Sequence, residues 1–151
     1  MAALTTASPF QTFEVAPQLL EQGKTSTRLV RTEFLNAGVQ VIANGGETNL
    51  HAHSRSDEIW FVLNGEATFY GEGDTVVANL KRNQGLLIPH GTAYWFESAS
   101  PENLVVMRFG AIVPGTGPDQ RVDLGERKWA VAGEAGGQQR EVKYAEARFG
   151  A

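Results

Sequence analysis

Residues 25–113 form a succession of short β-branched and aromatic runs that are separated by turn residues. This feature limits the fold most strongly, because such runs, bounded by Gly, Asn, Asp and Pro, are typical of β-strands. The sequence predicts nine strands: 25–34, 39–43, 49–53, 58–63, 66–71, 75–80, 85–89, 93–98 and 104–112. Helical periodicity is scarce, so the pattern favours an all-β protein, either a small sandwich or a barrel.

The length of 151 residues suits one compact domain with tails. We expect an N-terminal segment at 1–24, a barrel at 25–113 and a C-terminal extension at 114–151, where breaker clusters interrupt a region with few apolar residues. The extension has balanced acids and bases, unlike a polyelectrolyte tail. It is expected to pack on the barrel or on a partner subunit, and a partly disordered tail is the alternative. Three aromatic residues are its candidate anchors: Trp129, Tyr144 and Phe149.

The overall composition excludes several classes of partner and site. With a formal net charge of −4 and a pI near 5.4, the chain lacks the basic surplus that binds nucleic acid. The absence of cysteine leaves only nitrogen and oxygen donors for any metal ion. No apolar run approaches the roughly 20 residues of a membrane span, and no signal-peptide pattern occurs. We therefore expect a cytoplasmic protein with a small-molecule substrate and no membrane partner.

Two of the three histidines, His51 and His53, are one residue apart in a predicted strand. Side chains alternate along a strand, so both imidazoles point to the same face. Downstream, the pair Asn64-Gly65 suits a two-residue turn, which predicts a hairpin with Trp60 opposite Phe69. In that register one face carries Glu58, Trp60, Val62, Ala67 and Phe69.

The opposite face of the predicted hairpin is also largely apolar. Its residues are Ile59, Phe61, Leu63, Thr68 and Tyr70. A sheet with one solvent-exposed face would not tolerate so many apolar side chains on that face, so both faces must be covered. A second subunit is the expected cover, which predicts a homodimer.

Glu58 on the face of the two histidines would complete a set of two imidazoles and one carboxylate. Such a set binds Fe(II), Mn or a similar divalent ion and leaves coordination positions open. The predicted metal ligands are therefore His51, His53 and Glu58. The expected walls of the substrate pocket are Trp60, Val62, Phe69 and Phe96. The alternative is that the two histidines are a chance pair on a polar strand.

The spacing of five residues resembles the first motif of the cupin family, G-x5-H-x-H-x(3 or 4)-E-x6-G. The matching residues are Gly45, His51, His53, Glu58 and Gly65. The resemblance covers about residues 25–113. It implies a double-stranded β-helix barrel, also called a jelly roll, whose mouth holds a divalent metal ion.

The second cupin motif, G-x5-P-x-G-x2-H-x3-N, is only half met. Pro89 and Gly91 fit, whereas Asn83 replaces the first Gly and Ser98 replaces the final Asn. Asn tolerates the left-handed conformation that such turns use, so the change at position 83 is mild. The larger departure is Tyr94, which stands where the family has its fourth metal ligand, normally His.

Three roles are open for Tyr94: part of the pocket wall, a hydrogen-bond donor or proton shuttle near the metal, and a phenolate ligand. His90 could replace the fourth ligand, although its position before a turn glycine favours a rim role. Arg55 could bind a substrate carboxylate or be a solvated charge at a strand end. Arg108 would enter the pocket only if Leu104 and Val106, on the same strand face, point inward.

The resemblance implies a metal-dependent enzyme that acts on a small organic molecule. A dioxygenase and a Lewis-acid lyase or isomerase are both compatible with the ligand set, with Fe, Mn, Ni or Zn as the ion. The catalytic candidates are Tyr94, His90 and Arg55. The alternative is a non-catalytic cupin that binds a small ligand or acts as a sensor, with metal weakly held or absent.

Overall fold

The computed structural model describes residues 8–43, 48–115, 117–126, 129–130, 138–139 and 141–151. Gly45 of the first motif and the side chain of Trp129 lie outside this description. The strands are β1 (Gln18–Gln22), β2 (Lys24–Arg31), β3 (Leu35–Ile42), β4 (His51–His53), β5 (Ser56–Asn64), β6 (Ala67–Tyr70), β7 (Val76–Leu80), β8 (Gly85–Ile88), β9 (Trp95–Ser98), β10 (Leu104–Ile112), β11 (Arg121–Asp123), β12 (Trp129–Ala130), β13 (Gln138–Gln139) and β14 (Lys143–Arg148), with a 3₁₀ turn η1 (Glu72–Asp74). The nine predicted strands correspond to β2–β10, and the all-β prediction is confirmed.

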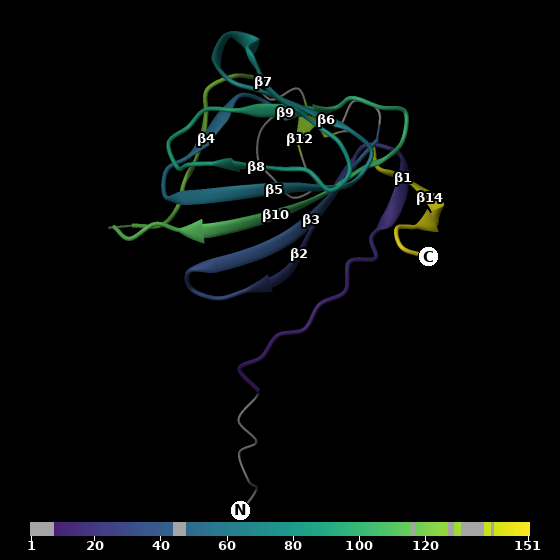
Figure 1. Cartoon of the computed structure of the whole chain (residues 1–151), viewed down its shortest axis with the longest axis horizontal. Coiled ribbons are helices and arrows are strands. Elements are labelled where there is room, and N and C mark those ends of the chain that lie inside the picture. Colours follow the sequence, from purple (N-terminus) through teal and green to yellow (C-terminus); the bar gives the residue numbers. More distant parts are fainter. Residues whose placement is uncertain (1–7, 44–47, 116, 127–128, 131–137, 140) are drawn as a thin grey trace, which may run out of the picture.

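Five strands form the larger sheet, in the order β2-β3-β10-β5-β8. Figure 1 shows these strands as one layer, with β8 at the top and β2 at the bottom. β10 runs antiparallel to both β3 and β5, so the last strand of the predicted barrel lies at the centre of this layer. The centre of the sheet is therefore made by segments that are far apart in the sequence.

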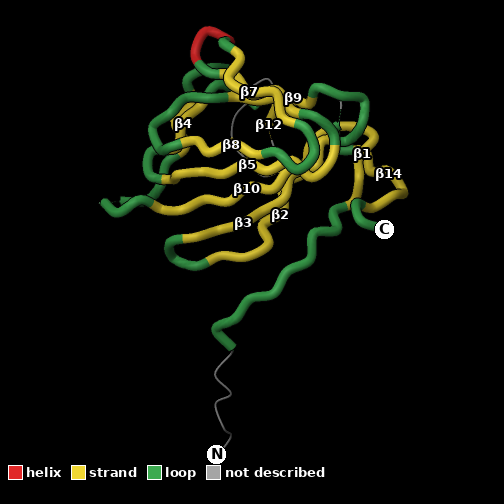
Figure 2. Tube along the Cα trace, viewed as in Figure 1, coloured by secondary structure: helices red, strands yellow, loops and turns green. Residues whose placement is uncertain are grey.

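The opposing layer is the smaller sheet β7-β6-β9, and β4 joins it through a bridge between His51 and Tyr94. Figure 2 shows the strands curling around a common interior, with η1 at one end. Alternate residues of both layers point inward and form a closed apolar core. Its largest buried members include Ile42, Trp60, Val62, Phe69, Phe96, Leu104 and Val106. Leu104 and Val106 face inward, which is the condition stated above for Arg108 to enter the barrel.

The predicted hairpin at Asn64-Gly65 is wrong. β5 pairs with β10 and β8 in one sheet, whereas β6 pairs with β7 and β9 in the other. Gly65 adopts φ +75° and turns the chain from one layer to the next, with Asn103 O only 2.8 Å from the place of a Cβ atom. Trp60 and Phe69 therefore meet across the core, with ring centroids 6.3 Å apart, instead of side by side in a ladder. Their assignment to the inner face is nevertheless right.

The outer face of the large sheet is partly covered by the ends of the described chain. β1 and β14 pair with each other, and Leu20, Val142 and Phe149 belong to an apolar cluster on this face. The Asn103 amide fixes β1 by bonding both the N–H and the C=O of Leu20, at 2.7 and 2.9 Å. The other candidate anchor, Tyr144, is 56% exposed.

Two further sequence features can be placed. Asn83 has φ 67°, the left-handed conformation that was expected at this position. Among the described residues, no helix is both long and apolar enough to cross a membrane.

Candidate functional site

The two histidines of β4 are held by different partners. His51 is buried, and its Nδ1–H donates to the carbonyl oxygen of Asn49 at 2.6 Å. His53 Nδ1 lies 3.0 Å from Asp119 Oδ2, and because a carboxylate only accepts, the imidazole is the donor. The ring centroids are 5.4 Å apart. Each contact fixes the orientation of its ring and leaves Nε2 available on the other side.

Glu58 is the centre of the buried polar cluster, with 1% of its surface exposed. Its Oε1 accepts a short hydrogen bond from Arg108 Nη2 and lies 3.3 Å from His53 Nε2. Its Oε2 accepts a hydrogen bond of 2.7 Å from the phenol of Tyr94. Both carboxylate oxygens are thus occupied, and the charge of Glu58 is balanced by a guanidinium group.

Backbone pairing brings Tyr94 to Glu58. The N–H of His51 donates to Tyr94 O at 3.0 Å, and the N–H of Tyr94 donates back at 2.9 Å, so the two residues are direct cross-strand neighbours. Their ring centroids are 4.4 Å apart. The phenol also accepts a hydrogen bond of 3.2 Å from the indole of Trp60. Tyr94 is therefore a fully bonded residue inside the barrel wall, with its proton directed at Glu58.

The surroundings shift three pKa values in this cluster. Burial lowers the pKa of His51 to about 3, and the nearby charge of Arg121 acts in the same direction. Burial, followed by the charge of Glu58, raises the pKa of Tyr94 well above its ordinary value. Burial by itself would lower the pKa of Arg108, but the hydrogen bond and the charge of Glu58 outweigh this effect, so the pKa of Arg108 is raised. At neutral pH the site thus holds a neutral His51, a neutral phenol and a charged Arg108.

These contacts bear on the predicted metal ligands. The two imidazoles suit a metal ion, because bonding at Nδ1 is the usual support of a ligating histidine. Glu58 does not suit a metal ion, because its two oxygens already accept hydrogen bonds from Arg108 and Tyr94, and the guanidinium group would repel a cation. In the part of the chain that the structure describes, no three His, Cys, Asp or Glu side chains are placed to hold one ion. In this arrangement the residues do not fit the predicted metal ion. Ligation of a metal ion by His51, His53 and Glu58 stays a prediction.

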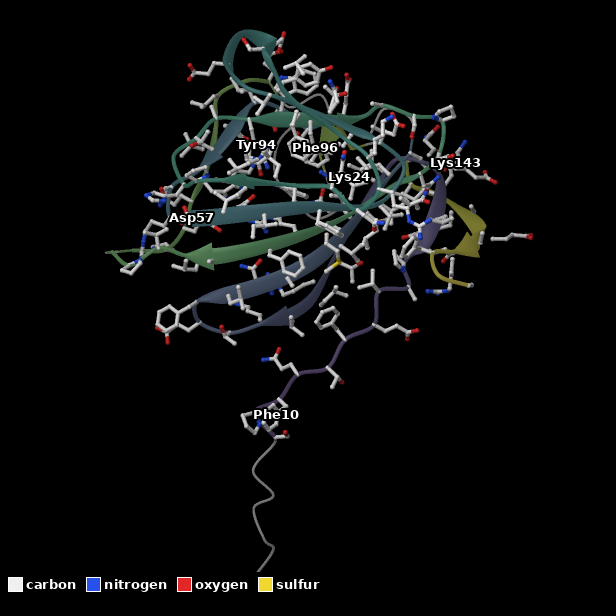
Figure 3. The ribbon with its side chains drawn as sticks, in the orientation of Figure 1. Phe10, Lys24, Asp57, Tyr94, Phe96 and Lys143 are labelled. Carbon is white, nitrogen blue, oxygen red and sulfur yellow. The ribbon has the colours of Figure 1, made fainter. Side chains whose placement is uncertain are left out.

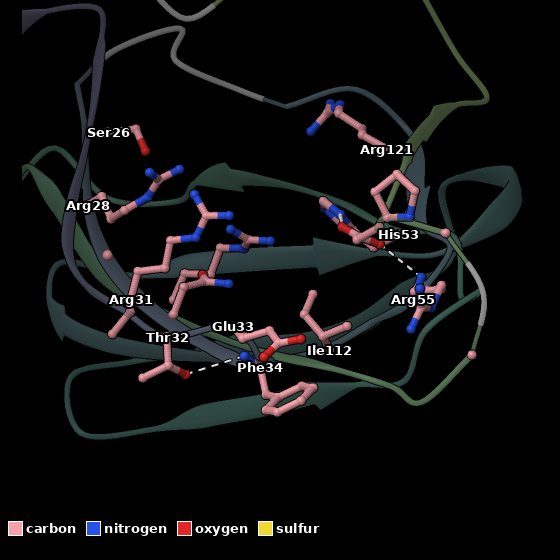
Figure 4. A pocket seen from close by; sticks show the side chains of 18 of the residues that line it. Ser26, Arg28, Arg31, Thr32, Glu33, Phe34, His53, Arg55, Ile112 and Arg121 are labelled. Atoms are coloured by element: carbon pink, nitrogen blue, oxygen red, sulfur yellow. Dashed lines mark hydrogen bonds and ion pairs between the residues drawn. The ribbon is translucent and has the colours of Figure 1, made fainter. Parts of the chain in front are cut away.

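A cleft of about 1230 Å³ opens beside this cluster. It is bounded by the inner face of β2, β3 and β10 and, across from them, by His53 and residues 114, 115, 117–119 and 121. Figure 4 shows Arg28 and Arg31 on one side and Arg55 and Arg121 on the other. Five arginines line the cleft: Arg28, Arg31, Arg55, Arg108 and Arg121. Two carboxylates line the cleft with them, Glu33 and Asp119, while Glu58 and Asp123 form ion pairs with Arg108 and Arg121. The cleft therefore keeps a small surplus of positive charge in a protein with a net charge of −4.

A β-bulge explains why β2 contributes two arginines to the cleft. Residues 28 and 31 would lie on opposite faces of a regular strand, because their separation is odd. The pairing of β2 with β3 shifts between Arg28 and Val30, so Arg28 faces Gly38 and Arg31 faces Asn36. The extra residue reverses the alternation and turns both side chains to the same face. Neither guanidinium has a hydrogen-bond or ion-pair partner among the described residues.

The other predicted site residues lie in different places. Arg55 lines the cleft, and its Nε and Nη2 donate to Val113 O at 3.2 and 2.7 Å. His90 is half exposed on the rim, with Nδ1 2.7 Å from Asp57 Oδ1, and is not among the residues that line this cleft. Figure 3 places Asp57 at the edge of the barrel and Tyr94 and Phe96 inside it. The four predicted pocket walls belong to the closed core: Trp60, Val62, Phe69 and Phe96.

The C-terminal extension supplies site residues that the sequence did not reveal. β11 pairs with β4, which sets Arg121 opposite His53 and Asp123 opposite His51. Asp119 bonds both His53 and the backbone N–H of Arg55, at 3.0 and 2.8 Å. Arg121 Nη2 donates to Asn49 Oδ1. The alternation of charges at 119, 121 and 123 was the available signal, because residues at this spacing share a strand face.

Comparisons with known proteins agree with this architecture. A family model described as a cupin domain matches residues 38–110. No curated protein sequence matches the chain. The structure is similar to a double-stranded β-helix protein from Klebsiella pneumoniae, at 19% identity and TM-score 0.57, over 68% of this chain and 87% of that chain.

Two further solved structures are similar to this chain. One is an RmlC-like cupin protein from Desulfovibrio desulfuricans, at 22% identity and TM-score 0.52, over 58% of this chain and 81% of that chain. The other is KdgF from a Halomonas species, at 25% identity and TM-score 0.52, over 59% of this chain and 79% of that chain. The predicted double-stranded β-helix fold is confirmed. Residues 38–110 thus match the cupin domain, and the chain has the fold of the cupin proteins.

Proposed function

We propose that this cupin binds a small organic anion in the arginine-lined cleft, and that it does so without a metal ion. One observation carries the proposal: five arginines converge on one cleft of a chain whose net charge is −4. A concave site with a surplus of one sign of charge concentrates ligands of the opposite sign. The ligand of the cleft is thus assigned as an anionic small molecule, whether or not it reacts after binding.

A carboxylate is the charged group that fits the cleft best. Guanidinium groups bind carboxylates through two parallel hydrogen bonds, and Arg28 and Arg31 have no described partner that would compete. Phe34 and Ile112 also line the cleft and offer apolar surface to the carbon skeleton of a ligand. The chemistry of the lining therefore favours an organic carboxylate over a bare inorganic anion.

The test is calorimetric titration of the purified protein with a panel of mono-, di- and tricarboxylates, each paired with its neutral amide. Arg28→Gln is expected to weaken binding of a carboxylate by at least about fivefold, since one charge-assisted contact is lost. Arg82→Gln is the matched control, because Arg82 is exposed and lies outside the cleft lining. Equal affinity for acid and amide, or equal effects of the two substitutions, would disprove the proposal.

The second candidate function is the metal-dependent enzyme that the first motif predicts, of dioxygenase, lyase or isomerase type. The Nδ1 contacts of His51 and His53 favour it, since they prepare both rings for a metal ion. Analysis of metal content separates the candidates: about one first-row ion per chain, lost in His51→Ala, would support the enzyme. Cytoplasmic location also stays a prediction.

A further inference from the structure

The charge of Arg108 reaches the place where the cupin resemblance implies a metal ion. Glu58 is buried, and a buried carboxylate is costly unless a cation accompanies it. Here Arg108 is that cation, through its bond to Oε1. The phenol of Tyr94 takes the other oxygen at 2.7 Å. Two side chains of this chain thus supply what an ion would otherwise supply to Glu58, a positive charge and a bond to each oxygen.

The register of the large sheet makes this contact possible. Arg108 pairs with Trp60, and Gly110 pairs with Glu58, so Arg108 and Glu58 are diagonal neighbours on the inner face. Gly110, directly opposite Glu58, has no side chain to compete for the carboxylate. The guanidinium therefore approaches from the centre of the sheet, and part of it remains open to the cleft.

We propose that Arg108 takes the place of the metal ion in this barrel, and that its removal would create a metal site from His51, His53 and Glu58. While the guanidinium is present, it repels a divalent ion and occupies the carboxylate that would bind it. Without it, Oε1 of Glu58 is released while Oε2 keeps its bond to Tyr94, and this oxygen and the two oriented imidazoles are the donors of a two-histidine, one-carboxylate site. This inference rests on the proposed metal-free ligand site.

The experiment measures metal binding by the full chain, stripped with chelator and then equilibrated with Co(II) or Zn(II). Metal content after desalting is combined with the visible spectrum of bound Co(II). The wild type is expected to retain below about 0.1 ion per chain, and Arg108→Met about one. The affinity for Co(II) should rise about 100-fold or more, because a unit charge at this range has an effect of that order.

Three variants make the result specific. Arg108→Lys keeps the charge and should remain metal-poor. Arg28→Met, which removes a cleft arginine that has no bond to Glu58, should also remain metal-poor. The double variant Arg108→Met/His51→Ala should lose the metal gained by the single substitution. A folded Arg108→Met protein, judged by circular dichroism, that gains no metal would overturn the inference.

The wild type provides a test that does not depend on the folding of any Arg108 variant. Stoichiometric metal in the wild type, absent from His51→Ala, would overturn the inference and support the metal-dependent enzyme. Failure of the proposed function has a different signature. A metal-poor wild type that binds no carboxylate disproves anion binding, and a gain of metal in Arg108→Met still upholds the inference.

Discussion

The phenol of Tyr94 donates a hydrogen bond of 2.7 Å to Glu58, and both side chains are buried. Replacing Tyr94 by Phe leaves the carboxylate oxygen and the indole N–H of Trp60 without this partner. We expect Tyr94→Phe to lower the free energy of unfolding by about 1–3 kcal/mol, the cost of unsatisfied buried groups. Urea denaturation of the wild type and of Tyr94→Phe measures this change in the free energy of unfolding.

The matched control for Tyr94 is Tyr70→Phe. The Tyr70 hydroxyl also bonds a carboxylate, Glu97 at 2.6 Å, but near the surface, where water replaces the lost bond. The loss of stability should be clearly smaller than for Tyr94→Phe. Equal losses in the two variants would show that the buried Tyr94–Glu58 hydrogen bond stabilises the fold no more than the Tyr70–Glu97 bond near the surface.

Protonation of His51 should destabilise the fold in acid. The folded protein holds the pKa of His51 at about 3 against an ordinary 6.5, so between these values the unfolded chain binds a proton that the native state does not. Stability therefore falls as the pH drops through this window, by about 2 kcal/mol between roughly pH 8 and pH 5. Denaturation of the chelator-treated protein at both pH values checks this.

Replacement of His51 by Gln should remove most of that pH dependence. His90→Gln, at the half-exposed rim, should leave it nearly unchanged. If the wild type and His51→Gln lose equal stability on acidification, His51 is not the group responsible.

Gly65 is required by both its conformation and its surroundings. Its φ of +75° is unfavourable for other residues, and a Cβ would lie 2.8 Å from Asn103 O. Gly73 has a similar φ of +64° but no atom within 4 Å of that position. We expect Gly73→Ala to cost about 1 kcal/mol, and Gly65→Ala clearly more, since a steric clash is added to the same strain. Equal melting temperatures of the two variants would refute this.

The outer face of the large sheet retains an uncovered apolar patch at Ile59 and Leu87. The two residues are paired in register and are 44% and 60% exposed. We expect this patch to be buried in a homodimer, because neighbouring apolar side chains favour association. Light scattering at micromolar concentration should report a dimer for the wild type and a monomer for Leu87→Asp.

Val77→Asp is the control for the homodimer. Val77 is 56% exposed on β7 of the small sheet, away from the patch, so its substitution should leave the dimer intact. A wild-type monomer, or a dimer that survives Leu87→Asp, would contradict the assignment of the interface.

The strands were predictable because their signals are local. Alternation along the chain placed Glu58 and Trp60 on one face, which is the inner one. The left-handed conformation at Asn83 was expected because Asn stands there in place of a motif Gly. The hairpin prediction failed for the opposite reason. An Asn-Gly pair suits a tight turn, but Gly65 turns the chain into the other sheet instead.

The sequence by itself thus determined the strands β2–β10, though not β1 or β11–β14, and which side chains of β4 and β5 share a face. Only the tertiary structure decided what those side chains meet. Arg108 reaches Glu58 from 50 residues away, and Asp119 reaches His53 from 66 residues away. The physical reason is that the period of a strand fixes the face of a residue, whereas its partners depend on pairing between distant strands.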